Sequence, residues 1–194
     1  EQAMKMADRF EIRRLARPYM ERLAAVSGET VNLGLWDGRG IVHLDKIDSR
    51  NLLRIDSRIG SQAPAYCTAL GKAILAHLPP AEVDDYLDRT PLTSVGPKTF
   101  TDPAAFRAAL DEIRKRGVAT DDEEMASGLR CVAAPVFDYT GAPRYALSVS
   151  GPAVRMGAEE IRRIAADVRD AARALSRQLG QPGRPPNPNP QSGP

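Results

Sequence analysis

Apolar side chains recur every three or four positions in two long segments, one near each end of the chain. The first covers residues 8–26 and the second residues 161–179, and arginines lie off the apolar stripe in both. Because this spacing gathers the apolar side chains on one side of an α-helix, both segments are predicted to be amphipathic helices. Pro18 falls inside the first helix and predicts either a kink or a restart at that residue.

Between these helices, alternation of apolar and polar positions predicts strands. Two such runs, residues 29–36 and 41–47, flank Asp37-Gly-Arg-Gly40, and an Asp-Gly turn between alternating runs indicates a β-hairpin. Two further strands are predicted over residues 131–137 and 144–150, joined by a second turn. The central part of the chain therefore contributes an antiparallel sheet.

Three shorter helices complete the predicted set, over residues 69–78, from Pro80 onward, and over residues 102–116. Asp102 is a good N-cap, and the proline after it suits the first turn of a helix. Helices at both ends, with hairpins and helices between them, predict an α+β domain in which helices cover an antiparallel sheet.

Composition limits the functions that this fold can serve. The 194 residues with 42% hydrophobic content suit one well-buried core, and a formal charge of +2 gives no field for general phosphate binding. No apolar stretch approaches the roughly 18 residues that span a bilayer, so no membrane partner is expected and the protein is expected to be cytoplasmic. Six of the fourteen residues at 181–194 are proline, which predicts a disordered tail.

Cysteine and histidine positions give no sign of a metal or redox centre. Cys67 and Cys131 are far apart in the sequence and lack the C-x-x-C spacing, and the two histidines, His43 and His77, lie in no catalytic or ligand motif. Cys131 begins an apolar strand, where a free cysteine usually acts as a small buried hydrophobe. No metal, cofactor or catalytic residue is expected.

The segment Thr68-Ala-Leu-Gly-Lys72 lies where a loop becomes a helix. Backbone N–H groups in a first helical turn lack intrahelical partners, so Ala69 and Leu70 are candidates to hold an organic carboxylate. The alternative is that Thr68 only caps the helix and Gly71 relieves crowding against the sheet. Lys72 is expected to be solvated or salt-bridged rather than a ligand contact.

Two other segments carry candidate polar groups. Ser148 and Ser150 share one side of a strand, which is either open to solvent or the floor of a cavity. The acidic run at residues 121–124 is typical of a solvated loop, but one member turned inward would accept hydrogen bonds from a hydroxyl or a ketone hydrate. Asp121 is the first residue of that run.

The order of these motifs along one domain resembles the effector-binding domain of the IclR family of bacterial transcription regulators. The resemblance spans residues 8–179, and its motifs lie at residues 17–18, 27–31, 68–73, 117–124, 128–136 and 147–152. It implies a GAF-like fold with about six strands. It also implies a metabolite sensor that is attached to an amino-terminal winged helix-turn-helix and whose ligand changes how dimers or tetramers hold operator DNA.

The resemblance also implies a pocket with little aromatic lining and no cation, suited to a small organic or aromatic acid. Its positions fall on Leu52, Ile55, Ala69, Leu70, Asp121, Cys131, Ser148 and Ser150. We expect residues 1–26 to form a linker helix towards a DNA-binding half that this sequence does not show. Residues 27–180 are then the sensor, followed by the proline-rich tail.

Two other functions compete with the sensor. A GAF-type reductase of free methionine sulfoxide would use cysteine as nucleophile and resolver, but only two cysteines exist and neither lies in a motif of that group. A ligand-free oligomerisation module would instead have a closed, dry core.

Overall fold

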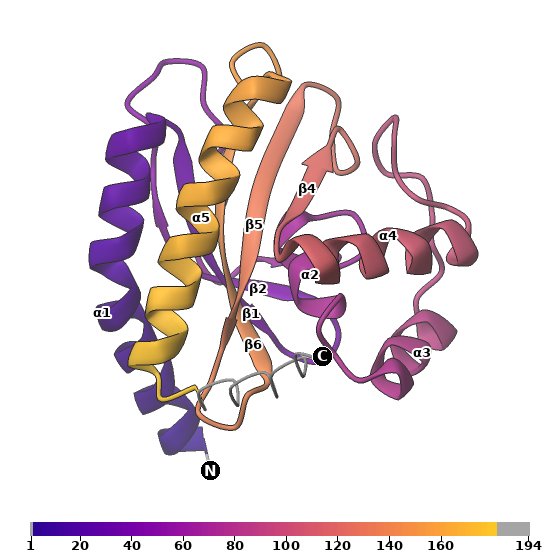
Figure 1. Ribbon diagram of the computed structural model, residues 1–194, viewed down its shortest axis with the longest axis horizontal. Coiled ribbons are helices and arrows are strands. Elements are labelled where there is room, and N and C mark those ends of the chain that lie inside the picture. Colours follow the sequence, from indigo (N-terminus) through magenta and orange to yellow (C-terminus); the bar gives the residue numbers. More distant parts are fainter. Residues whose placement is uncertain (1, 182–194) are drawn as a thin grey trace, which may run out of the picture.

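A computed structural model describes the backbone of residues 2–181 and the side chains of residues 8–181. From residue 182 onward, the predicted disordered tail lies outside the described residues. Within residues 2–181, six strands form one antiparallel sheet in the order β3-β2-β1-β6-β5-β4 (Figure 1). The strands are β1 (Thr30–Trp36), β2 (Ile41–Ile47), β3 (Gln62–Ala63), β4 (Ala119–Asp122), β5 (Leu129–Phe137) and β6 (Pro143–Pro152).

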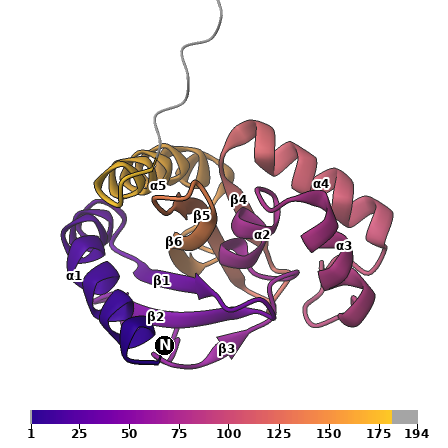
Figure 2. The same cartoon turned by 90° about the horizontal axis from the view of Figure 1, so that it is seen from below.

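Helices lie on both sides of this curled sheet (Figure 2). They are α1 (Gln2–Ser27), α2 (Ala69–Leu75), α3 (Pro80–Arg89), α4 (Pro103–Arg116) and α5 (Ala158–Gln178). The α+β class, the six-stranded antiparallel sheet and the long terminal helices are confirmed. None of the described helices is long and apolar enough to cross a membrane.

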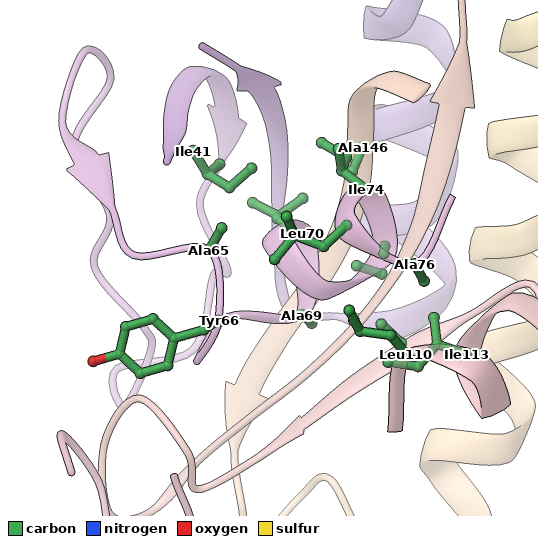
Figure 3. Close-up of a cluster of buried hydrophobic side chains, with 14 of the residues drawn as sticks. Ile41, Ala65, Tyr66, Ala69, Leu70, Ile74, Ala76, Leu110, Ile113 and Ala146 are labelled. Carbon is green, nitrogen blue, oxygen red and sulfur yellow. The ribbon is translucent and has the colours of Figure 1, made fainter. Parts of the chain in front are cut away.

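The two faces of the sheet bury different side chains. On β6, Tyr145, Leu147 and Val149 join the core beneath α1 and α5, as the alternating pattern predicts. Ala146 belongs to the second core, beneath α2, and Figure 3 shows it beside Leu70 and Ile74 of that helix. Ser148 and Ser150 follow Ala146 on the same face and are 1% and 4% exposed. The solvent-exposed interpretation of the two serines is therefore wrong.

Helix α1 runs through Pro18 as one continuous helix, without the predicted restart. Pro18 is exposed, so the backbone groups that it leaves unpaired are on the side that faces water. The buried stripe differs from the predicted one: Ile12, Ala16, Met20 and Leu23 are the buried residues, and Phe10, which the spacing places on the stripe, is 66% exposed. The sheet determines which side of this helix is covered.

Helix α2 is shorter than predicted and ends at Leu75. The chain then turns, and the guanidinium of Arg114 in α4 donates hydrogen bonds to the carbonyl oxygens of Ala76 and Leu78. Carbonyl groups near the end of a helix lack intrahelical donors. The Arg114 guanidinium supplies the hydrogen bonds that a further helical turn would have supplied. The helix is thereby fixed to α4 as well as to the sheet.

Gly71 brings α2 against the chain that leads into it. A Cβ atom at this position would lie 2.2 Å from the carbonyl oxygen of Ala65 and 2.3 Å from its Cα atom. The crowding that Gly71 avoids is therefore with backbone outside the sheet. The sequence had suggested instead that Gly71 relieves crowding against the sheet.

Gly71→Ala is expected to lower the free energy of unfolding by about 1–3 kcal/mol or more, because rigid backbone cannot yield to the new methyl group. Urea unfolding measures this. Gly157→Ala is the matched control, since a Cβ atom at residue 157 would meet no other atom within 4 Å, and it should cost under about 1 kcal/mol. Equal losses in the two variants would contradict the steric account.

Candidate ligand-binding site

A cavity of about 360 Å³ lies between the sheet, the start of α2 and the loop at residues 48–61 that joins β2 to β3. Seven of the eight residues predicted for the pocket line it: Ile55, Ala69, Leu70, Asp121, Cys131, Ser148 and Ser150. Leu52 does not, and its side chain is fully exposed. The family resemblance, and not strand or helix periodicity, assigned Leu52 to the pocket, and the residue lies in the loop between β2 and β3.

Strand pairing brings the polar floor of the cavity together. Ser150 is directly opposite Cys131 on β5, and Cys131 is opposite Asp121 on β4. Asn32 on β1 is opposite Ser148. Because directly opposed residues share a face of a sheet, these five side chains, from four strands, point to the same side.

Asp121 is the most unusual group in this floor. Its Oδ1 accepts hydrogen bonds from the backbone N–H groups of Glu124, at 2.8 Å, and Met125, at 3.4 Å. Its Oδ2 has no hydrogen-bond partner among the described residues, although the residue is only 1% exposed. Burial raises the pKa of the Asp121 carboxyl to about 6. A buried acceptor without a donor is costly, so a ligand donor here would gain more than one at the surface.

The remainder of the acidic run is only partly solvated. Glu124 is 5% exposed and forms a buried ion pair with Lys72, whose ammonium also donates to the carbonyl oxygen of Thr120 at 2.6 Å. The solvated-loop interpretation is thus wrong for Asp121 and Glu124, and the salt-bridged alternative for Lys72 is correct. This ion pair ties α2 to the end of β4 and does not itself line the cavity.

The two thiols are buried and are not activated. Burial raises the pKa of the Cys67 thiol to about 12 and raises that of the Cys131 thiol as well. Cys67 Sγ lies 3.5 Å from the Sδ atom of Met125. Since the thiolate is the nucleophilic form, neither cysteine is prepared for covalent chemistry.

The loop at residues 48–61 covers the cavity and is held by polar contacts. Thr30 Oγ1 donates to the carbonyl oxygen of Ile55 at 3.1 Å, and the Ser57 hydroxyl donates to Asn32 Oδ1. Arg155, which is paired with the buried Glu29, donates to the carbonyl oxygen of Leu53 at 2.7 Å. These contacts anchor the loop to the first residues of β1 and to the chain after β6.

A larger and more open cleft, of about 980 Å³, lies elsewhere on the molecule. It is lined by parts of α1, the β5–β6 turn and the chain between α2 and α3, including Trp36, His77, Arg114 and Tyr145. None of the eight predicted pocket residues is among them. The smaller cavity is the better candidate site because Asp121, which lines it, has a buried acceptor atom without a partner among the described residues.

A family model described as the bacterial transcriptional regulator IclR C-terminal domain matches residues 4–177. This chain belongs to the IclR family. It is 38% identical over 161 residues to the HTH-type transcriptional regulator BhcR of Paracoccus denitrificans, covering 83% of this chain and 58% of BhcR. It is 39% identical to the HTH-type transcriptional regulator KdgR of Escherichia coli, covering 83% of this chain and 61% of KdgR. The chain thus spans about three fifths of these relatives.

Solved structures of the family have the same architecture. The crystal structure of the Thermotoga maritima IclR superposes with a TM-score of 0.84 at 37% identity, covering 87% of this chain and 68% of that one. The C-terminal domain of E. coli KdgR gives a TM-score of 0.79 at 36% identity, covering 87% of this chain and 98% of that domain. The IclR C-terminal fold is therefore established for nearly all of the described residues.

Several lining residues of this IclR domain were missed by sequence reasoning. Arg58, an exposed residue of the covering loop, is among them, together with Asn32, His43, Ser57 and Met125. The position of Asn32 within the apolar run of β1 was an available signal, since a polar residue inside a buried strand needs a partner. Arg58 and Ser57 lie in a loop without periodicity and gave no signal.

Asp121→Asn is expected to stabilise the domain at pH 8 and to lose about half of that advantage by pH 5. The folded pKa of about 6 lies above the ordinary value for aspartate of about 3.9, so the folded domain binds this proton more tightly than the unfolded chain does. The ionised carboxylate therefore lowers stability above pH 6, and this penalty fades progressively as the pH falls from about 6 to about 3.9.

Urea unfolding at pH 5 and pH 8 tests this difference. Asp122→Asn is the control, because its pairing with Lys98 lowers the pKa of Asp122, so this change should cost some stability at pH 8 instead. A gain from Asp121→Asn that is equal at both pH values would show that the carboxylate is not ionised at a cost in the folded domain.

Proposed function

We propose that this domain is the sensor of a bacterial transcription regulator. It binds a small organic acid in the cavity beside α2, and occupancy alters how an attached winged helix-turn-helix holds operator DNA. The observation that carries this proposal is the cavity of about 360 Å³ lined by Asp121, whose buried Oδ2 has no hydrogen-bond partner among the described residues. Cavities of this size with a few converging polar groups are typical ligand sites.

The start of α2 supports recognition of a ligand oxygen. Thr68 Oγ1 accepts the N–H of Gly71 at 3.2 Å, and the N–H of Lys72 reaches the carbonyl oxygen of Thr68 at 3.0 Å. Of the first-turn amides, those of Ala69 and Leu70 are left for a ligand, and both residues line the cavity. Together with the hydroxyls of Ser148 and Ser150, they supply donors for a carbonyl, hydroxyl or carboxylate oxygen.

Family membership supports the regulatory part of the proposal. BhcR and KdgR are both described as HTH-type transcriptional regulators, and this chain aligns with about three fifths of each. Helix α1 packs Ile12, Ala16, Met20 and Leu23 against the sheet. A shift of the sheet would therefore shift this helix. We propose that its amino-terminal end continues into the DNA-binding half and that the regulator works as a dimer or tetramer.

The competing functions have less support. A thiol-dependent reductase needs an accessible thiolate, whereas burial raises the pKa of both cysteine thiols. A dry assembly module does not explain a cavity with polar groups from several strands. We therefore propose binding without turnover, in which the ligand shifts a conformational or assembly equilibrium.

A panel of small aliphatic, hydroxy and aromatic acids should include at least one that raises the melting temperature. A ligand present at 100 times its dissociation constant adds about 2.7 kcal/mol of stability, which shifts the melting temperature of a domain this size by several degrees. Differential scanning fluorimetry measures the shift. No shift with any acid would favour the assembly module, and sulfoxide reduction that is lost in Cys131→Ser would favour the reductase.

Ser148→Leu combined with Ser150→Leu should fill the cavity and abolish the shift caused by that acid while the domain still folds. Ser148→Ala combined with Ser150→Ala is the matched control, because it removes the hydroxyls and keeps the space, so binding should be weakened rather than lost. Circular dichroism checks folding and calorimetry measures the dissociation constant. Unchanged affinity in the leucine variant would place the ligand elsewhere.

A further inference from the structure

The open cleft of about 980 Å³ lies where the end of β1, the β5–β6 turn and the start of α1 come together. Aromatic side chains are concentrated in it. The chain has one tryptophan, five tyrosines and four phenylalanines, and three of these ten, Trp36, Phe137 and Tyr145, line the cleft. Pro79 and Pro80, where α3 begins, line it as well. The cleft therefore offers aromatic rings to a binding partner.

Two edge-to-face contacts fix the orientation of rings in this cleft. Trp36 packs against Tyr86 with 5.6 Å between ring centroids, and Phe137 packs against His77 with 5.4 Å. The His77 Nδ1 atom lies 2.9 Å from the carbonyl oxygen of Ala73, and burial lowers the pKa of His77, so its ring is neutral at pH 7. Rings that are already held in place lose little entropy when a partner binds, which favours recognition.

Gln181, the last described residue, lies close to this cleft. Its N–H donates to the carbonyl oxygen of Ser176 at 3.0 Å, and Ser176 Oγ accepts the N–H of Phe137 at 2.9 Å. A Cβ atom at Gly180 would lie 3.6 Å from the Cβ atom of Tyr139, which is 72% exposed in the β5–β6 turn. Figure 1 shows the end of α5, this turn and the start of α1 at the same end of the sheet. The chain that follows therefore starts beside the aromatic lining.

The sequence after Gln181 is typical of a polyproline II segment. Six of its thirteen residues are proline, and four of these lie in Arg184-Pro-Pro-Asn-Pro-Asn-Pro190. Proline lacks an N–H group and fixes φ near −65°, which disfavours helix and sheet and favours polyproline II. At about 3.1 Å per residue, these seven residues extend about 22 Å. Segments of this kind dock in grooves lined by aromatic side chains because their conformation is already formed.

Charge agrees with this occupant. Arg184 is the only charged residue after Gln181. Four carboxylates and three guanidiniums line the cleft, so with a neutral His77 it carries one excess negative charge. One of the carboxylates is that of Glu82, which is exposed in the first turn of α3, and the guanidinium of Arg114 already donates to two backbone carbonyls. Exposed charges contribute little, so the aromatic contacts are the main attraction.

We propose that residues 184–190 dock in this cleft of their own chain as a polyproline II segment, with prolines against the rings of Trp36 and Phe137. Asp8 and Arg9, at the start of α1, also line the cleft, so the docked segment joins the end of α5 to the start of α1. It thereby restrains the end of α1 from which, in the proposed regulator, the DNA-binding half extends. The docking itself does not depend on a ligand in the cavity beside α2.

A segment of the same chain is the favoured occupant because of where it begins. A short tether gives it an effective concentration of about millimolar at the cleft, so even a weak contact is occupied. A proline-rich segment of a second copy or of another protein lacks this advantage.

Trp36 provides the measurement because it is the only tryptophan in the chain. Acrylamide quenching of its fluorescence should be at least about twofold stronger in a triple glycine variant than in the unaltered full chain, since glycine lacks both the apolar ring and the fixed φ of proline. The variant combines Pro185→Gly, Pro186→Gly and Pro188→Gly. Nuclear Overhauser effects between the Trp36 indole and the Hδ protons of these prolines should be present in the unaltered chain.

Two controls separate docking from a general effect of substitution. Three glycines beyond the segment, in the combined variant Gln191→Gly, Ser192→Gly and Pro194→Gly, should leave the quenching unchanged. On the domain itself, Ala142→Arg should abolish the Overhauser effects, because residue 142 is exposed and lines the cleft, where the added side chain takes up space and repels Arg184. Ala108→Arg should preserve them, because residue 108 is exposed on α4 and does not line the cleft.

Equal quenching in the unaltered chain and the proline-to-glycine variant, or no Overhauser effects between Trp36 and the prolines, would overturn the inference. Protection of Trp36 that is lost on about hundredfold dilution would also overturn it, because docking within one chain does not depend on concentration whereas docking on a second copy does. The melting-temperature shift caused by a small acid should be the same in the proline-to-glycine variant, so a failure here leaves the proposed function intact. Thermal melts of each variant check that the fold is retained.

Discussion

A sheet that is buried on both faces needs enough apolar volume on each side, and in this domain the two sides receive unequal amounts. Long helices α1 and α5 cover one face, where large side chains such as Leu33, Leu147 and Val149 fill the space. The other face carries smaller residues, including Ala133 and Ala146, and the helix that lies directly on it is only seven residues long. The remaining volume is the cavity.

The position of α2 determines whether that volume stays open. Leu70 approaches Gly34 so closely that a Cβ atom there would lie 3.1 Å from its methyl group, and Gly71 lies against the backbone of Ala65. Lys72 then joins the helix to Glu124 through a buried ion pair. A buried pair adds little net stability but is costly to break, so its main effect is to fix one position of the helix. One short motif thus supplies a close approach, a cap and an electrostatic anchor.

Two residues that line the cavity carry polar atoms whose hydrogen-bonding capacity the described residues do not use. Asp121 Oδ2 and His43 Nδ1 are both buried without partners among the described residues. Folding leaves few such atoms, because each one costs free energy. Both residues line the same cavity, which is the physical basis for assigning this space to a ligand.

Sequence reasoning determined the elements of this protein because periodicity is a local property. The three-to-four spacing of residues 161–179 and the alternation of β6 each report a face that must be buried, and the family motifs brought Asp121, Cys131 and the two serines into one predicted site. Gly117, with its positive backbone φ of 73°, ends α4 where the sequence indicated. None of these signals says which partner covers each face.

Tertiary structure alone decided what depends on contacts between distant segments. Strand register placed Asp121 beside Cys131 and turned it away from water, although an acidic run is usually solvated. The covering loop has no periodicity, so only its contacts with Thr30 and Asn32 decided that Ile55 and Arg58 line the cavity and that Leu52 faces water. Burial, register and charge pairing belong to pairs of segments, and a single stretch of sequence does not contain them.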